Sequence, residues 1–341
     1  MRTAFLSLAA LASFAASAFA APQSMDKVLK RNNDGKASSG KPSDVEILNY
    51  ALTLEFLERN FYADVLKKFD ANAFKQAGYS ATVRERFVAL AEQEASHVNF
   101  LVNALGEAAV TDCTYVFGLS SPKAVVATAR LLENTGVAAY LGAAGDISDP
   151  AYLAAAASIL TIEARHASYL NEINGATGFP AAYDSGLNYA QVYSIAAPLI
   201  VPNTCGAGAL PSSIQVFPTL TWLTKTPRAG RKSAIKFTPK SGYSGDYYVA
   251  FIWGGKTQYA KVGEQQTVNV PKDLVGLICA SISFLHLGLA LLAQALSMLL
   301  CQWPSSTLTF AIRLPDAVVT TSSSALDNSN TVAGPGVFYL D

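Results

Sequence analysis

The chain has 341 residues, which is enough for one large domain or two domains of ordinary size. Its 25 basic residues equal its 25 acidic residues, so the net charge neither attracts nucleic acid nor indicates an acidic, solvating tail. Any partner must therefore be recognised by a local site.

The first 20 residues have the composition of a secretory signal peptide. One arginine precedes an apolar stretch, which ends in the small-x-small sequence Ala18-Phe19-Ala20. A membrane anchor is the alternative, but the apolar stretch is short and rich in small residues. We therefore predict a signal peptide over residues 1–20 and a secreted or cell-surface protein.

Four cysteines can form disulfides in an exported protein. We favour a bond between Cys113 and Cys205, because Cys279 and Cys301 lie together in a separate apolar stretch. Four cysteines allow three pairings, and the sequence leaves all three open.

Residues 21–43 are polar and predict a flexible lead-in, whereas residues 44–175 have the apolar spacing of four helices. We predict a helix from Ser43 or Asp44 to about Asp70, a second from about Ser80 to Leu105, a third that opens at Pro122, and a fourth that opens at Pro150 and closes at Gly175. The connections are short, long and short. This order predicts a four-helix bundle with one long crossover.

The character of the sequence changes after the fourth helix. Residues 176–214 predict a linker with a short helix, and residues 215–341 alternate β-branched or aromatic residues with polar ones between glycine turns. We therefore predict an α plus β protein, in which a small antiparallel β-domain follows the bundle.

An apolar segment at 276–301 interrupts the β-rich region. It contains no charged residue and is long enough to span a bilayer, although strand-like sequence lies on both sides of it. Three interpretations stay open: a membrane span, an apolar helix packed against the protein, or an insertion such as translated intron sequence.

Two helices repeat one motif on their apolar faces. Glu94 and His97 on the second helix, and Glu163 and His166 on the fourth, share the form Glu-Ala-x-His-x-x-aromatic-Leu. Residues three apart lie on one helix face, so each pair can address one point in space. One such pair usually lies on the protein surface, or contains a core histidine whose hydrogen bonds are satisfied. Two such pairs on facing helices favour a shared site.

The first and third helices each add a carboxylate to this face. Glu55 and Glu133 lie in mid-helix, and each has a tyrosine seven residues later, Tyr62 and Tyr140. Four carboxylates in one core are costly unless cations balance them, and two divalent cations would balance all four. The predicted ligands are Glu55, Glu94, His97, Glu133, Glu163 and His166, with Glu58 as a rival to Glu55.

These motifs resemble those of the ferritin-like di-iron carboxylate proteins. The resemblance covers about residues 44–175, and it implies that Glu94 and Glu163 bridge two metal ions while Glu55 and Glu133 are terminal ligands. It implies iron, with manganese as an alternative, and it makes Tyr62 and Tyr140 candidate redox neighbours. The wider layout is similar to the secreted fungal desiccation-related or stress-response ferritin-like proteins.

The resemblance implies a di-iron oxidoreductase that oxidises Fe(II) or reduces dioxygen or peroxide in stress protection. No fifth helix follows the bundle directly, so we expect no ferritin-type cage. The alternative is a non-enzymatic structural or surface protein whose bundle is stapled by metal or has lost it, with cell-wall contacts through the β-domain. A membrane-tethered form of either stays open, and no nucleic-acid partner is expected.

Overall fold

The computed structural model describes residues 41–210, 214, 216–224, 227–283, 320–321 and 331–340. The predicted signal peptide and most of the lead-in lie outside these residues, as do Cys301 and residues 284–301 of the apolar segment.

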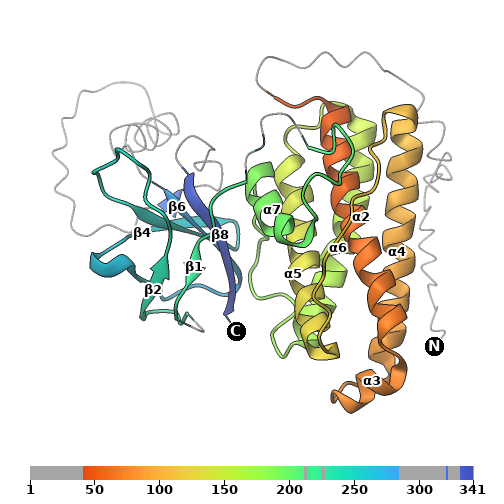
Figure 1. Ribbon diagram of the computed structural model, residues 1–341, viewed down its shortest axis with the longest axis horizontal. Coiled ribbons are helices and arrows are strands. Elements are labelled where there is room, and N and C mark those ends of the chain that lie inside the picture. The colour runs from red at the N-terminus through yellow and green to blue at the C-terminus, as the bar shows by residue number, and fades with distance from the viewer. Residues whose placement is uncertain are drawn as a thin grey trace, which may run out of the picture.

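Four long helices form the bundle (Figure 1). They are α2 (Asp44–Lys68), α4 (Ala81–Leu105), α5 (Pro122–Ala143) and α6 (Pro150–Ile173). Helix α2 begins at a capping box between Ser43 and Glu46, and α5 and α6 begin at Ser121 and Asp149, each followed by proline. The short, long, short order of connections is the predicted one, and the α plus β fold class is confirmed.

A short helix absent from the prediction lies between the first two. The predicted first helix ends at Lys68, because Phe69 is extended and Asp70 caps a new helix, α3 (Ala71–Gln76), by accepting a hydrogen bond from the Ala73 amide. Phe74 of α3 is fully buried. The connection from α2 to α4 thus contributes to the core.

The long crossover is tied to the segment that follows α7 (Tyr189–Ala196). Cys113 in the crossover forms a disulfide with Cys205, which confirms the preferred pairing. Beside it, the Val116 amide donates to the Leu199 carbonyl at 2.9 Å and the Val201 amide to the Thr114 carbonyl at 2.8 Å. These bonds hold the crossover against the segment that follows α7.

The described strands form two antiparallel sheets. The three-stranded sheet has the order β1 (Thr221–Trp222), β2 (Lys232–Lys236), β5 (Thr267–Asn269). The five-stranded sheet has the order β7 (Thr320–Thr321), β4 (Lys256–Lys261), β3 (Tyr248–Trp253), β6 (Gly276–Ser283), β8 (Thr331–Leu340). Gly254 and Gly255, both with positive φ, make the turn between β3 and β4.

Strand β6 corrects the prediction for the apolar segment. Residues 276–283 pair with β3 on one side and β8 on the other, so the first part of the segment is an inner strand and neither a packed helix nor a span. Its remaining residues, 284–301, lie outside the described residues. Among the described helices, none combines the length and apolar character that a bilayer crossing needs.

The five-stranded sheet is buried on both faces. Alternate residues of β3 and β6, such as Ile252 and Cys279, join the core cluster of the bundle and α7. Their neighbours, such as Phe251 and Ile278, pack with the three-stranded sheet. The sheet therefore lies between the helices and the second sheet, as Figure 1 shows.

Candidate metal centre

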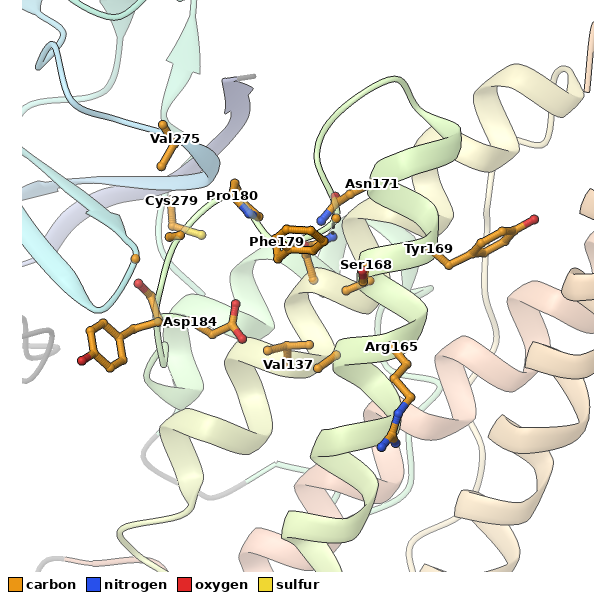
Figure 2. Close-up of a pocket in the computed structure, with 18 of the residues that line it drawn as sticks. Val137, Arg165, Ser168, Tyr169, Asn171, Phe179, Pro180, Asp184, Val275 and Cys279 are labelled. Carbon is orange, nitrogen blue, oxygen red and sulfur yellow. Dashed lines mark hydrogen bonds between the residues drawn. The ribbon is translucent and has the colours of Figure 1, made fainter.

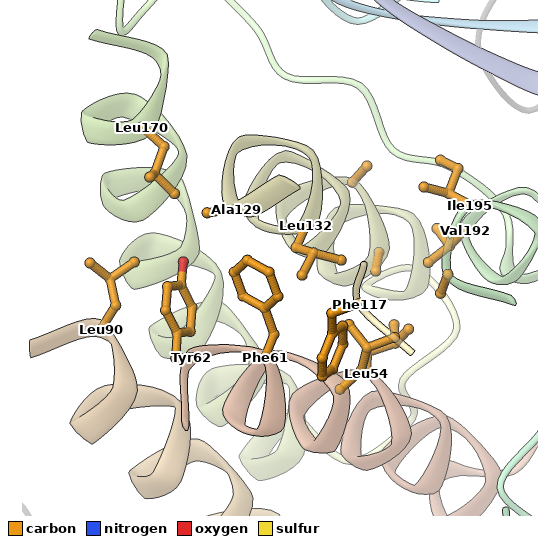
Figure 3. Packing of buried hydrophobic residues seen from close by; sticks show 14 of the residues in the cluster. Leu54, Phe61, Tyr62, Leu90, Phe117, Ala129, Leu132, Leu170, Val192 and Ile195 are labelled. Atoms are coloured by element: carbon orange, nitrogen blue, oxygen red, sulfur yellow. The ribbon is translucent and has the colours of Figure 1, made fainter. Parts of the chain in front are cut away.

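Aromatic and aliphatic side chains enclose the middle of the bundle. Phe61 and Tyr62 of α2 and Leu90 of α4 are fully or almost fully buried there, with Leu132 of α5 and Leu170 of α6 (Figure 3). The ring of Tyr62 contacts the rings of Phe61 and Phe87 edge-on. A polar group in this region must therefore find its partners within the core.

The six predicted ligands meet in this core. Glu55, Glu94, Glu133 and Glu163 have no exposed surface, and His97 and His166 are 9% and 6% exposed. They form two overlapping groups: Glu55, Glu94, His97 and Glu163; and Glu94, Glu133, Glu163 and His166. Within each group, one donor atom per residue lies within 4.8 Å of the others.

Each histidine turns Nδ1 toward the carboxylates. Nδ1 of His97 lies 3.0 Å from Glu94 Oε2 and 3.2 Å from both Glu55 Oε2 and Glu163 Oε1. Nδ1 of His166 lies 3.0 Å from Glu94 Oε1 and 3.0 Å from Glu133 Oε2. Glu94 thus places one oxygen beside each histidine, and Glu163 belongs to both groups.

This donor set fits two cations. A single proton on Nδ1 can serve one acceptor well, yet two or three carboxylate oxygens converge on each nitrogen. Oε2 of Glu163 is buried and has no hydrogen-bond partner among the described residues. In the part of the chain that the structure describes, Oε1 of Glu163 and Oε1 of Glu94 contact only the histidine Nδ1 atoms given above. Adjacent donors around one octahedral ion at about 2.1 Å lie about 3 Å apart, which matches the observed spacings.

The two tyrosines predicted as redox neighbours form a crossed pair of hydrogen bonds. Tyr140 of α5 donates to Glu55 Oε1 of α2 at 2.5 Å, and Tyr62 of α2 donates to Glu133 Oε1 of α5. In both glutamates the second oxygen, Oε2, faces a histidine Nδ1. The tyrosines therefore orient the carboxylates toward the two candidate cation positions.

The structure separates Glu55 from its rival Glu58. Both side chains are buried, at 0% and 4% exposure, but only Glu55 belongs to a donor group. Glu58 lies one turn further along α2, and its Oε1 faces Gly136 of α5. Five carboxylates, not four, consequently point into this part of the core.

Two pKa values change because carboxylates lie beside histidines. Burial alone would raise the pKa of Glu94, but the hydrogen bonds from His166 and His97 lower it to about 2. Burial alone would lower the pKa of His166, but its bonds to Glu133 and Glu94 raise it to about 9.

Three other carboxyls in the cluster have raised pKa values, unlike Glu94. Burial raises the pKa of Glu55 to about 7, although the hydrogen bond to His97 opposes the change. The pKa values of Glu163 and Glu58 are raised by burial first and by neighbouring carboxylates second. The cluster thus needs either protons or cations, as expected for a metal site.

Sequence reasoning missed two residues of the site. Gln93 accepts a hydrogen bond from Nε2 of His166 at 2.5 Å, which leaves Nδ1 free to bind a cation. Nothing in the sequence connects these residues, since they lie on different helices. The second is Gly136, which aligning α2 with α5 would have revealed, because it occupies the position that corresponds to Glu58.

One large cavity and two small cavities lie near the cluster. A cavity of about 560 Å³ lies between α5, α6, residues 178–185 and β6, but none of the six predicted ligands lines it (Figure 2). Two small cavities of about 20 and 10 Å³ adjoin Glu58 and Gly136. The cluster is therefore buried, and two small cavities lie beside it.

A four-helix bundle with one inward glutamate on two helices and Glu-x-x-His on the other two defines the ferritin-like class. Residues 43–176 match the family model described as the ferritin-like domain. The chain therefore contains a ferritin-like domain, which accounts for the bundle but not for the β-sheets.

A curated relative supports the same assignment. Protein rds1 of Schizosaccharomyces pombe is 27% identical over 158 residues, which cover 46% of this chain and 39% of rds1. The chain thus spans well under half of the length of the curated relative it matches.

Proposed function

We propose that this chain is an exported ferritin-like protein that binds two metal ions, with iron as the resident metal. The observation that carries the proposal is the convergence of two or three buried carboxylate oxygens on Nδ1 of each histidine. Glu94 and Glu163 would bridge the ions, because each belongs to both donor groups. Export is supported by the composition of residues 1–20 and by the disulfide.

The chemistry we propose is oxidation of Fe(II) coupled to reduction of dioxygen or peroxide. Fe(II) would be the substrate that supplies the electrons: two Fe(II) ions, oxidised to Fe(III), would reduce dioxygen with two protons to hydrogen peroxide, or peroxide with two protons to two water molecules. Carboxylate and imidazole donors suit both oxidation states of iron. Outside a fungal cell or at its surface, this reaction would remove Fe(II) and oxidant together, which agrees with a role in stress protection.

The residues of the chain have separate tasks in this scheme. Glu94 and Glu163 hold the ions together, and the bonds from Tyr62 and Tyr140 keep Glu133 and Glu55 oriented. The apolar core around the cluster excludes bulk water. An oxidant bound at the cluster would therefore be kept from side reactions with solvent.

The test is the metal content and turnover of the secreted protein. We expect about two ions per chain by elemental analysis, and loss of at least one ion in Glu94→Ala, because this residue contacts both histidines. Glu92→Ala is the matched control, since Glu92 lies on the same helix but is exposed. Unchanged stoichiometry in Glu94→Ala would contradict the proposal.

A second measurement separates catalysis from a structural role. Steady-state oxidation of Fe(II) by dioxygen or peroxide, followed by absorbance, should continue for many turnovers per chain. Bound metal that raises the unfolding temperature without any turnover would instead favour the alternative, a bundle stapled by its ions.

A further inference from the structure

The two halves of the bundle repeat the glutamate, histidine and tyrosine positions of the cluster, with Glu58 as the exception. Glu94 and His97 of α4 correspond to Glu163 and His166 of α6, and Glu55 and Tyr62 of α2 correspond to Glu133 and Tyr140 of α5. The crossed tyrosine bonds obey this symmetry. It breaks between these pairs, where α2 has Glu58 and α5 has Gly136.

Gly136 and Glu58 fit each other sterically. A Cβ atom at position 136 would lie 2.8 Å from Glu163 Oε2 and 3.2 Å from Glu58 Oε1. Glycine in the middle of a helix lowers its stability by about 1 kcal/mol relative to alanine. We therefore expect the space left by the absent side chain at position 136 to offset this loss. The space is used by two carboxylates, which both lie over the glycine.

Glu58 lies between the two donor groups. On the same face of α2, Glu55 precedes it by three residues and contacts His97, while Tyr62 follows it by four and donates to Glu133. Oε2 of Glu163, on the side that faces Glu58, has no hydrogen-bond partner among the described residues. An opposite charge between these two carboxylates would satisfy both.

Other observations indicate which cation Glu58 would contact. Oε1 of Glu163 lies 3.2 Å from Nδ1 of His97, so Oε2, which lies with Glu58 Oε1 over Gly136, is the oxygen left for the other donor group. Glu163 and Glu133 both belong to the group around His166. Cavities of about 20 and 10 Å³ adjoin the Glu58 side chain and Gly136, so the side chain has free space beside it.

We propose that Glu58 is a seventh metal ligand, which binds only the cation held by Glu94, Glu133, Glu163 and His166. The two cation positions are therefore unequal: the His166 position has one more carboxylate than the His97 position. It fills first, and it binds its ion more tightly. This inference rests on the proposed two-metal function and specifies how the two positions differ.

Titration of the full-length protein with Mn²⁺ and with Co²⁺ tests this inequality. In isothermal titration calorimetry with Mn²⁺, the wild type should bind two ions in two steps of different affinity. Glu58→Gln keeps the size of the side chain but removes its charge, so we expect two ions still and at least a tenfold weaker first step. With Co²⁺, loss of one donor should intensify the visible absorption bands of the first ion.

Two further variants complete the experiment. Glu58→Asp keeps the charge but withdraws the carboxylate by about 1.5 Å, so the first step should weaken as well. Glu92→Gln, at an exposed position of α4, should match the wild type in both titrations. Circular dichroism shows whether each variant is folded. If Glu58→Gln does not fold, Glu58→Asp tests whether Glu58 is a ligand.

The outcomes separate the two levels of the proposal. If the wild type binds neither metal, the proposed two-metal function is wrong, and so is the proposed role of Glu58. A wild type that binds two ions, together with Glu58 variants of unchanged affinity and unchanged Co²⁺ spectrum, overturns only the seventh ligand.

Discussion

The charge balance of the cluster predicts opposite pH dependences for the metal-stripped and the metal-loaded protein. The pKa of Glu55 is raised from 4.5 to about 7, so the folded protein holds a proton that the unfolded chain releases. Its contribution to the stability of the stripped protein therefore falls as the pH rises from 4.5 to 7.

The histidines act in the same direction at higher pH. The pKa of His166 is raised from 6.5 to about 9, so its stabilising contribution is complete below pH 6.5 and is lost as the pH rises to 9. That of His97 is raised too, by Glu163, Glu55 and Glu94 against the effect of burial. The pKa of Glu94 is lowered to about 2, so its contribution is constant above pH 5.

The expected size of the effect is measurable. The pKa changes of Glu55 and His166 each correspond to about 3 kcal/mol. Because both groups respond to the charge of Glu94, we expect the sum between pH 5 and 9 to be about 3 to 5 kcal/mol. For a chain of this length, that lowers the unfolding temperature by on the order of 10 °C.

Metal loading reverses the sign, because cations bind deprotonated ligands and bind more tightly as the pH rises. The assay is thermal unfolding by circular dichroism from pH 5 to 9, with chelator or with saturating Mn²⁺. Glu55→Gln should reduce the fall between pH 5 and 7, to which Glu58 and Glu163 also contribute through their raised pKa values, and Glu92→Gln should leave it unchanged. A stripped protein whose unfolding temperature is level or rises from pH 5 to 9 would refute the reasoning.

Three further changes have definite expected outcomes. Glu163→Gln should reduce bound metal from two ions to one or none by elemental analysis, while the stripped protein gains about 1 to 3 kcal/mol, because one buried carboxylate is removed. Replacing Cys113 and Cys205 by serine should cost about 4 kcal/mol in a denaturant titration, because the disulfide closes a loop with a sequence separation of 92; an unchanged midpoint would contradict this. Gly142→Ala should destabilise the fold by more than about 3 kcal/mol, because its Cβ would lie 1.9 Å from a loop carbonyl oxygen, whereas Gly145→Ala, with open space around it, should be tolerated.

Helical periodicity explains how much of the site could be predicted. Residues three apart share a face, so Glu94 with His97 and Glu163 with His166 were bound to point the same way. The same rule could not choose between Glu55 and Glu58, which also lie three apart. The structure shows that both are buried, and that the opening for the second one is created by an absent side chain on another helix, at Gly136.

The first residues of the apolar segment, 276–283, were not predicted as a strand for a different physical reason. A strand that is covered on one face alternates apolar and polar residues, but a strand covered on both faces does not. Cys279 of β6 packs toward the bundle, while Ile278 and Ile282 pack toward the other sheet. An uninterrupted apolar run was therefore as consistent with an inner strand as with a helix, and the sequence offered no signal to choose between them.

The β-sheets also affect the candidate metal centre, because they contact the helices that carry half of the six predicted ligands. Arg130 lies one turn before Glu133 on α5, and its guanidinium lies over the Tyr339 ring of β8 at 3.5 Å. Its Nε donates to Asn171 of α6 at 2.8 Å, two turns after Glu163. Arg130 is only 7% exposed, so removing β8 would leave an arginine and an apolar surface uncovered beside α5 and α6. Since the cluster requires these two helices to hold the carboxylates of Glu133 and Glu163 together against their mutual repulsion, we expect the sheet to stabilise the geometry of the site from outside the bundle.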